Sequence, residues 1–239
     1  MIKRAVIVAF LIALLMPCAS AGEITAKGLA KRTGQVFAGY NDFWVWVTQR
    51  FPGTDKKPIK GRVYFLRPDK FRLNFGQPPF LVHGTDGKEY WAYEEKSKTI
   101  TTSALGKDTP VHVLFQIFAA GDQMVRALDQ YFKVDKLESG TYVDPKSKKK
   151  IPAYMLKISL KPEKLKELSE KGGNKLTKDA SQRWTFWIDQ KTYLPRKIQI
   201  DWETKRREIF EFGTFYYNIP LSPKLFRRPS PPGVELKKQ

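Results

Sequence analysis

Cysteine and histidine are almost missing from this chain of 239 residues, which holds one cysteine and two histidines. The one cysteine, Cys18, lies in the segment before Gly22 that is predicted below to be cleaved. The chain that remains then has neither a thiol nucleophile nor a cysteine-based zinc site. No Gly-rich phosphate loop, nucleophile elbow or His-Glu-x-x-His motif occurs. We therefore expect no enzyme, no cofactor and no metal site.

Long hydrophobic runs are also scarce, because the one such run, residues 5–16, is shorter than the roughly 20 residues of a membrane-spanning helix. Lys3 and Arg4 precede it and Ala19-Ser20-Ala21 follows it, which is the pattern of a cleaved signal peptide. Residues 1–21 are thus predicted to be removed from an exported chain. Lipidation of Cys18 is an alternative, but Pro17 stands where Gly, Ala or Ser would be usual.

Acidic residues are few relative to basic ones, with 24 Asp and Glu against 43 Lys and Arg and a formal charge of +19. The basic residues cluster at 146–150, 164–178 and 205–207. Such a balance favours nucleic acid, an anionic membrane face or an acidic protein as a partner. The alternative is a solvated surface with no specific partner.

Alternating apolar residues predict a mainly β fold with some α-helix. Helices are expected at 23–40, 111–120 and 122–128, because their apolar residues recur at helical spacing or run together. The strands are expected at 43–51, 61–67, 71–75, 80–83, 88–93, 99–103, 131–138, 152–160, 183–189, 195–202 and 206–217. Residues 22–239 should then form one domain, a barrel or strongly curved antiparallel sheet whose open face is covered by helices.

Large apolar residues recur on one face of successive predicted strands, and Arg67 ends one of these apolar stripes. They either pack as a core against the helices or line a cavity that takes an apolar ligand such as an acyl chain. The candidate cavity residues are Trp44, Val63, Phe65, Phe71, Leu73, Phe75, Trp91, Trp184, Phe186, Trp202 and Phe210.

Several motifs resemble those of the periplasmic outer-membrane lipoprotein carriers, the LolA family. Gly61-x-Val63-x-Phe65-x-Arg67-Pro68-x-x-Phe71-x-Leu73 is similar to the family signature. The segments 86–93, 187–195 and 226–235 are similar to later strands and to the C-terminal end, and Thr109-Pro110 to the start of a lid helix. The resemblance covers essentially residues 22–239.

The resemblance implies a single LolA-like domain, an open and unclosed antiparallel β-barrel with helices over its concave face. It also implies a periplasmic chaperone that holds the acyl chains of lipoproteins in the cavity and carries them from the inner to the outer membrane. Arg67 would latch the lid when the cavity is empty. The lid helix would contribute Pro110, Val113, Leu114, Ile117 and Phe118.

The partners implied by the resemblance are an inner-membrane ATP-driven lipoprotein release complex and an outer-membrane acceptor. We expect a monomer that binds acylated lipoproteins or lipids and no nucleic acid. One alternative is a lipid-sensing or lipoprotein-sensing regulator on the same fold. Another is an exported basic protein that binds an anionic polymer or a membrane surface, and it predicts salt-sensitive binding without an apolar ligand.

Overall fold

The computed structural model describes residues 24–76, 78–104, 122–167 and 182–238. Among these residues, no helix is long and apolar enough to cross a membrane. The predicted signal peptide, 1–21, lies outside the described residues, so its cleavage stays a prediction. The same holds for the predicted lid-helix residues Pro110, Val113, Leu114, Ile117 and Phe118.

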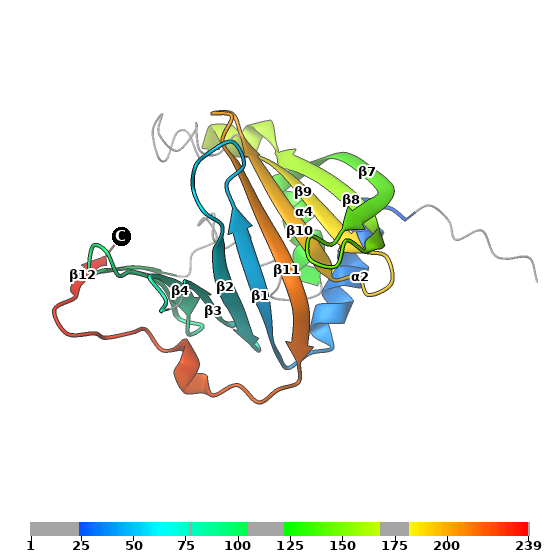
Figure 1. Ribbon diagram of the computed structural model, residues 1–239. Helices are drawn as coiled ribbons and strands as arrows, with labels where there is room; N and C mark the ends of the chain where they lie inside the picture. Colours follow the sequence, from blue (N-terminus) through cyan, green and yellow to red (C-terminus); the bar gives the residue numbers. More distant parts are fainter. Residues whose placement is uncertain (1–23, 77, 105–121, 168–181, 239) are drawn as a thin grey trace, which may run out of the picture.

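The described residues form one twelve-stranded sheet (Figure 1). Its order is β12-β6-β5-β4-β3-β2-β1-β11-β10-β9-β8-β7, so the edge strands β12 and β7 are not paired with each other and the sheet is open. Every neighbouring pair is antiparallel except β12 and β6. This confirms the predicted mainly β, unclosed architecture. The strands are β1 (Asp42–Arg50), β2 (Ile59–Leu66), β3 (Lys70–Phe75), β4 (Leu81–Thr85), β5 (Glu89–Glu94), β6 (Thr99–Ala104), β7 (Phe132–Val143), β8 (Lys150–Leu160), β9 (Gln182–Asp189), β10 (Pro195–Trp202), β11 (Arg207–Tyr217) and β12 (Glu235–Lys238).

The β2–β3 hairpin shows how the sequence sets the register of this sheet. Phe65 pairs with Phe71, and Gly61 pairs with Phe75, so the apolar residues of both strands share one face. A Cβ atom added to Gly61 would lie 2.8 Å from the Phe75 ring. Glycine at this position therefore leaves the space in which the Phe75 ring packs.

Two α-helices, α2 (Ala26–Ala38) and α4 (Asp122–Tyr131), pack against one face of the sheet, which we call the inner face. Thr25 caps α2 by accepting a hydrogen bond from the Gly28 amide. Leu29 and Phe37 of α2 and Leu128 of α4 belong to the same buried cluster as the inner-face side chains. The opposite face of the sheet is called the outer face.

Beyond β11, the chain returns along the sheet to its far edge (Figure 1). A short 3-10 helix, η2 (Pro223–Phe226), packs on β3, with Phe226 fully buried. Arg72, on the outer face of β3, donates a 2.8 Å hydrogen bond to the Leu225 carbonyl. No helix or strand was predicted beyond residue 217, so both η2 and β12 were missed.

Candidate functional site

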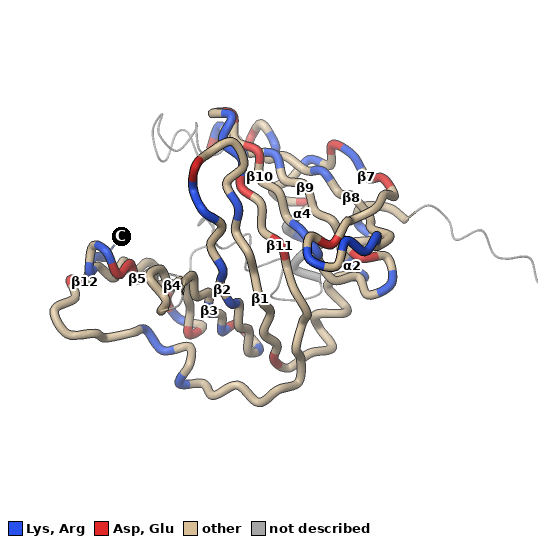
Figure 2. The backbone as a smooth tube through the Cα atoms, viewed as in Figure 1, with Lys and Arg blue, Asp and Glu red and all other residues tan. Residues whose placement is uncertain are grey.

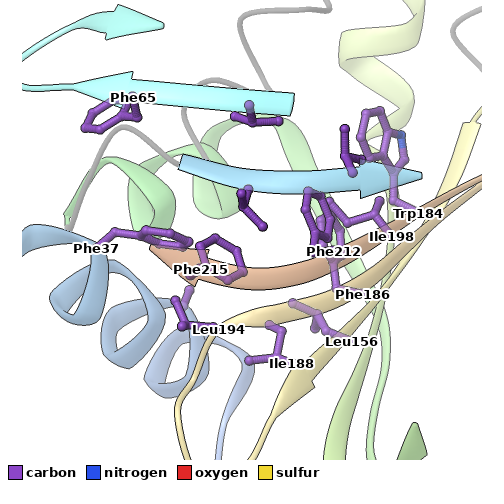
Figure 3. Packing of buried hydrophobic residues seen from close by; sticks show 14 of the residues in the cluster. Phe37, Phe65, Leu156, Trp184, Phe186, Ile188, Leu194, Ile198, Phe212 and Phe215 are labelled. Atoms are coloured by element: carbon purple, nitrogen blue, oxygen red, sulfur yellow. The ribbon is translucent and has the colours of Figure 1, made fainter. Parts of the chain in front are cut away.

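The inner face carries a continuous apolar cluster that runs across the sheet from β3 to β8. Among the predicted cavity residues, Leu73, Trp202 and Phe210 are partly buried and pack against this cluster. In Figure 3, side chains from α2 and from several strands converge, including Phe37, Phe65, Phe186 and Phe215. Six further predicted cavity residues are buried members of the cluster, namely Val63, Phe65, Phe71, Phe75, Trp184 and Phe186.

Two predicted cavity residues, Trp44 and Trp91, lie on the outer face, and their assignment to the inner face was wrong. Trp44 pairs across strands with Tyr64 and Tyr216, and its ring stacks on Tyr216 with centroids 4.1 Å apart. Trp91 pairs with Gly84 and is fully buried in a separate small cluster with Val82. That cluster lies on the side reached by the C-terminal segment.

Phe43, not Trp44, is the inner-face residue at the start of β1. Its ring centroid lies 5.4 Å from that of Phe37 and 5.2 Å from that of Phe65. Because residues 43–47 are apolar on both faces, their pattern cannot say which parity points inward. Phe43 is placed inward by its pairing with the inner-face residue Phe65, which only the folded sheet reveals.

The inner face becomes polar from β4 to β6. Across the strands, the row that begins with Phe65 and Phe71 continues with Thr85, Tyr90 and Ser103. The next row contains His83 and Thr101. No site role was predicted for His83, and this polar part of the inner face was missed, because each polar residue taken alone looks like an ordinary strand residue.

His83 and Tyr90 form a hydrogen-bonded pair within this polar part. The His83 Nδ1 atom lies 2.5 Å from the Tyr90 hydroxyl oxygen. Burial lowers the pKa of His83 to about 4 and raises the pKa of Tyr90. Both side chains are therefore neutral near pH 7, and the polar part of the inner face offers hydrogen bonds without a charge from this pair.

Arg67 joins the end of β2 to the end of α2. Its Nε donates a 2.7 Å hydrogen bond to the Tyr40 carbonyl, and its Nη2 donates a 2.6 Å hydrogen bond to the Phe37 carbonyl. Its backbone amide also donates to the Asn41 carbonyl at 2.9 Å. A guanidinium is well suited to this place, because the last carbonyls of a helix lack intrahelical partners and carry partial negative charge.

The helix that Arg67 contacts is thus α2, at the N-terminal end of the described chain. The predicted lid, which contains Pro110 and Phe118, lies outside the described residues. A latch between Arg67 and that segment therefore stays a prediction. In the described structure, the Arg67 guanidinium holds α2 over the apolar face through two charge-assisted hydrogen bonds, which are stronger than neutral ones.

In the described part of the chain, no group of three or more His, Cys, Asp and Glu residues is placed to hold a metal ion. Asp189, one of the few buried carboxylates, is bound by the Arg196 guanidinium at 2.8 Å. It also accepts hydrogen bonds from the amides of Lys191 and Thr192, so its position is explained by the β9–β10 turn.

One family model matches the chain. It is described as outer membrane lipoprotein carrier protein LolA, and the match spans residues 47–177, which is more than half of the chain. The matched segment includes the β2–β3 hairpin and Arg67. No curated protein matches the chain in sequence.

Solved structures are similar to the chain at low sequence identity. An uncharacterized conserved protein from Thermus thermophilus is 13% identical, with 90% of this chain and 99% of that chain covered and a TM-score of 0.52. MucB in the Pseudomonas aeruginosa MucA/MucB complex is 11% identical, with 85% and 61% covered and a TM-score of 0.46. The Mycobacterium tuberculosis lipoprotein LppX is 14% identical, with 83% and 99% covered and a TM-score of 0.42.

Proposed function

The chain belongs to the LolA family of outer membrane lipoprotein carrier proteins, and we propose that it carries lipoproteins or related lipids from the inner to the outer membrane. In this proposal it is a periplasmic, non-catalytic carrier that shelters acyl chains between the inner face and the helices. The observation that carries the proposal is the apolar inner face beneath α2, with Arg67 fastened to the end of that helix.

An acyl chain needs such a shelter because its exposure to water is costly. Burial of a chain contributes about 0.8 kcal/mol per CH₂ group, so a fatty chain in water costs roughly 10 kcal/mol or more. The inner face offers aromatic and branched aliphatic side chains from at least seven strands, among them Phe65, Phe186 and Ile198. These are the side chains against which an acyl chain would pack.

Loading requires that part of this surface be uncovered, and α2 is the element that covers it within the described residues. Moving α2 away exposes Leu29 and Phe37 and breaks the two hydrogen bonds of Arg67. An acyl chain restores the lost apolar contacts, whereas the empty protein regains them when α2 returns. The ligand therefore shifts the protein toward the open state because it binds that state better.

Release depends on the same balance. Hydrogen bonds to charged groups contribute about 1.5–3 kcal/mol each, so Arg67 favours the closed, empty state by a modest amount. Such a carrier can give up its load to an acceptor without an energy source of its own. We accordingly propose an inner-membrane ATP-driven release complex as the donor and an outer-membrane protein as the acceptor.

The test is native mass spectrometry with a synthetic triacylated lipopeptide. The chain from Gly22 onward is loaded, mixed with empty vesicles, and the bound fraction is followed with time. Wild type should release the lipopeptide, and Arg67→Leu should retain it at least about tenfold longer, because the loss of even one of the two Arg67 bonds weakens the closed state by about 1.5 kcal/mol or more. Arg62→Leu is the matched control, since Arg62 lies on the outer face of β2 and touches Trp46, not α2.

Two results would count against the carrier. One is the absence of lipopeptide binding in all three proteins. The other is equal retention in Arg67→Leu and Arg62→Leu, which would mean that loss of any arginine, and not release of α2, explains the effect.

A further inference from the structure

One end of the molecule carries a set of exposed cations that the carrier proposal does not use. They come from three segments: the outward side of α2, the turn between β7 and β8 with the first residue of β8, and the turn between β9 and β10. We call this set the basic face. Its members are Lys31, Arg32, Lys146, Lys148, Lys149, Lys150 and Lys191, all of them exposed.

The three segments of the basic face are held beside one another by hydrogen bonds. The Nη1 atom of Arg32 donates to the Tyr193 hydroxyl at 2.5 Å, which joins α2 to the β9–β10 turn. The Gln190 amide donates to the Pro152 carbonyl at 3.0 Å, which joins that turn to β8. In Figure 2, the blue segments of these elements gather around the end of the sheet that bears the α2 label.

The charges of the basic face are not compensated within the described residues. None of its seven cations makes an ion pair there, whereas Lys27, on the same helix, pairs with Asp129 at 2.9 Å. Asp144, the acid of the β7–β8 turn, accepts hydrogen bonds from the Lys146 and Ser147 amides and from the Ser147 hydroxyl. These bonds, to Ser147 foremost, lower the pKa of Asp144, so the carboxylate is ionised but engaged in the turn.

The backbone that carries the lysines of the β7–β8 turn is fixed by hydrogen bonds within the turn. Asp144 closes the turn, its carbonyl accepts from the Lys148 amide at 2.9 Å, and Lys148 has a positive φ of 57°. Val143, half exposed, pairs across the hairpin with Lys150. An exposed aliphatic side chain paired with a lysine suits a lipid interface, where the apolar group enters and the ammonium group meets phosphates.

We propose that the basic face docks the protein on a bilayer surface rich in anionic phospholipids. Lysine predominates over arginine, and a flexible, strongly hydrated point charge fits a diffuse anionic surface better than a fixed bidentate site. The choice of a lipid surface over another polyanion rests on the proposed lipid carriage. Docking by this face places α2 against the membrane, beside the place where an acyl chain would enter or leave.

The experiment is vesicle co-sedimentation with the chain from Gly22 onward. Vesicles contain phosphatidylethanolamine with phosphatidylglycerol, or phosphatidylcholine alone. Wild type should bind the anionic vesicles at low salt, release them at high salt, and ignore the neutral ones. The fourfold variant Lys146→Gln, Lys148→Gln, Lys149→Gln, Lys150→Gln should bind about 600-fold more weakly, given about a fivefold loss per lysine near the surface.

A matched variant separates the basic face from net charge. Lys56→Gln, Lys57→Gln, Lys60→Gln and Lys96→Gln remove the same charge from exposed residues of other loops and strands. This variant should lose less than about tenfold in binding, because its lysines lie away from the docked surface. Equal loss in both variants, or no binding by wild type, overturns the proposal.

Two further readouts identify the partner. Polyglutamate that binds the basic face as tightly as the anionic vesicles would overturn the choice of a lipid surface. Lipopeptide retention, measured as for Arg67 but with vesicles of phosphatidylcholine alone, should be unchanged in the fourfold variant, because the basic face does not bind neutral vesicles. A protein that docks but retains no lipopeptide contradicts the carrier and not the docking surface, so the two failures are distinguishable.

Discussion

The inner and outer faces of the sheet use aromatic residues in opposite ways, and two neighbours in β1 show the difference. Phe43 is fully buried on the inner face among Phe37, Phe65 and Phe215. Trp44 lies partly exposed on the outer face, stacked on Tyr216. Aromatic content by itself therefore does not identify a cavity wall; the partners of each ring do.

Cations accompany the rings of the outer face. The Arg62 guanidinium lies 4.8 Å from the Trp44 ring centroid and 4.1 Å from that of Trp46. The Lys197 ammonium lies 3.4 Å from the Trp187 ring centroid, and burial lowers the pKa of Lys197. Cation–π contacts of this kind stabilise partly exposed aromatic surface without a covering helix.

The largest expected effect comes from truncating one ring on each face. Phe43→Ala should lower the free energy of unfolding by about 3–5 kcal/mol, because it leaves a cavity in the closed inner cluster. Trp44→Ala should cost less, about 1–2 kcal/mol, because a partly exposed ring loses mainly stacking and one cation–π contact. Urea unfolding of both variants measures the two values, and equal losses would contradict the separation of the faces.

A smaller effect is expected from filling space on the outer face. A Cβ atom on Gly84 would lie 2.4 Å from the Trp91 ring, so Gly84→Ala should cost about 1–3 kcal/mol through overpacking. Gly213→Ala is the control, because its Cβ would meet the Trp46 Cβ at an ordinary 3.4 Å. Its unfolding free energy should stay close to wild type. An unchanged free energy of unfolding in Gly84→Ala would mean that the Trp91 ring does not lie against residue 84.

The smallest expected effect concerns pH and the polar part of the inner face. The pKa of His83 is about 4 in the folded protein and about 6.5 in an unfolded chain. Between these values the unfolded chain binds more protons, so the free energy of unfolding falls as the pH falls. From about pH 7.5 to about pH 5 the loss due to His83 should be about 1–2 kcal/mol.

The control for this effect is His83→Gln, which has no titratable group at the site. Urea unfolding at the two pH values should show a smaller loss in the variant than in wild type. The same pH dependence in both proteins would mean that His83 is not held neutral in the folded state.

Local pattern predicted the hairpins well. Residues 61–75 alternate with a period of two around a Pro-Asp turn, and they form β2 and β3 with the predicted side chains inward. The short strand β12 escaped prediction because Glu235–Lys238 is polar and exposed, and its partner β6 lies more than 130 residues away. Backbone pairing at a sheet edge needs no apolar pattern, so no local signal marks it.

The candidate site was predictable only in part, because some of its features follow from a local pattern and others from how distant elements pack. Arg67 was singled out because a charge ends an apolar stripe, but its partners, the carbonyls of Phe37 and Tyr40, follow from how α2 docks. The polar part of the inner face emerges when β3, β4 and β5 are aligned, since only then do His83 and Tyr90 meet.

The sequence by itself determined that this is a basic, mainly β chain with a run of hairpins, and its motifs pointed to the right family. Side-chain alternation and turn chemistry act over a few residues, so they can be read along the chain. Tertiary structure alone decided which parity of β1 faces inward, where the tail returns, and that Lys31, Lys148 and Lys191 share one face. These features depend on contacts between residues distant in sequence, and their energies arise only once the strands and helices have packed.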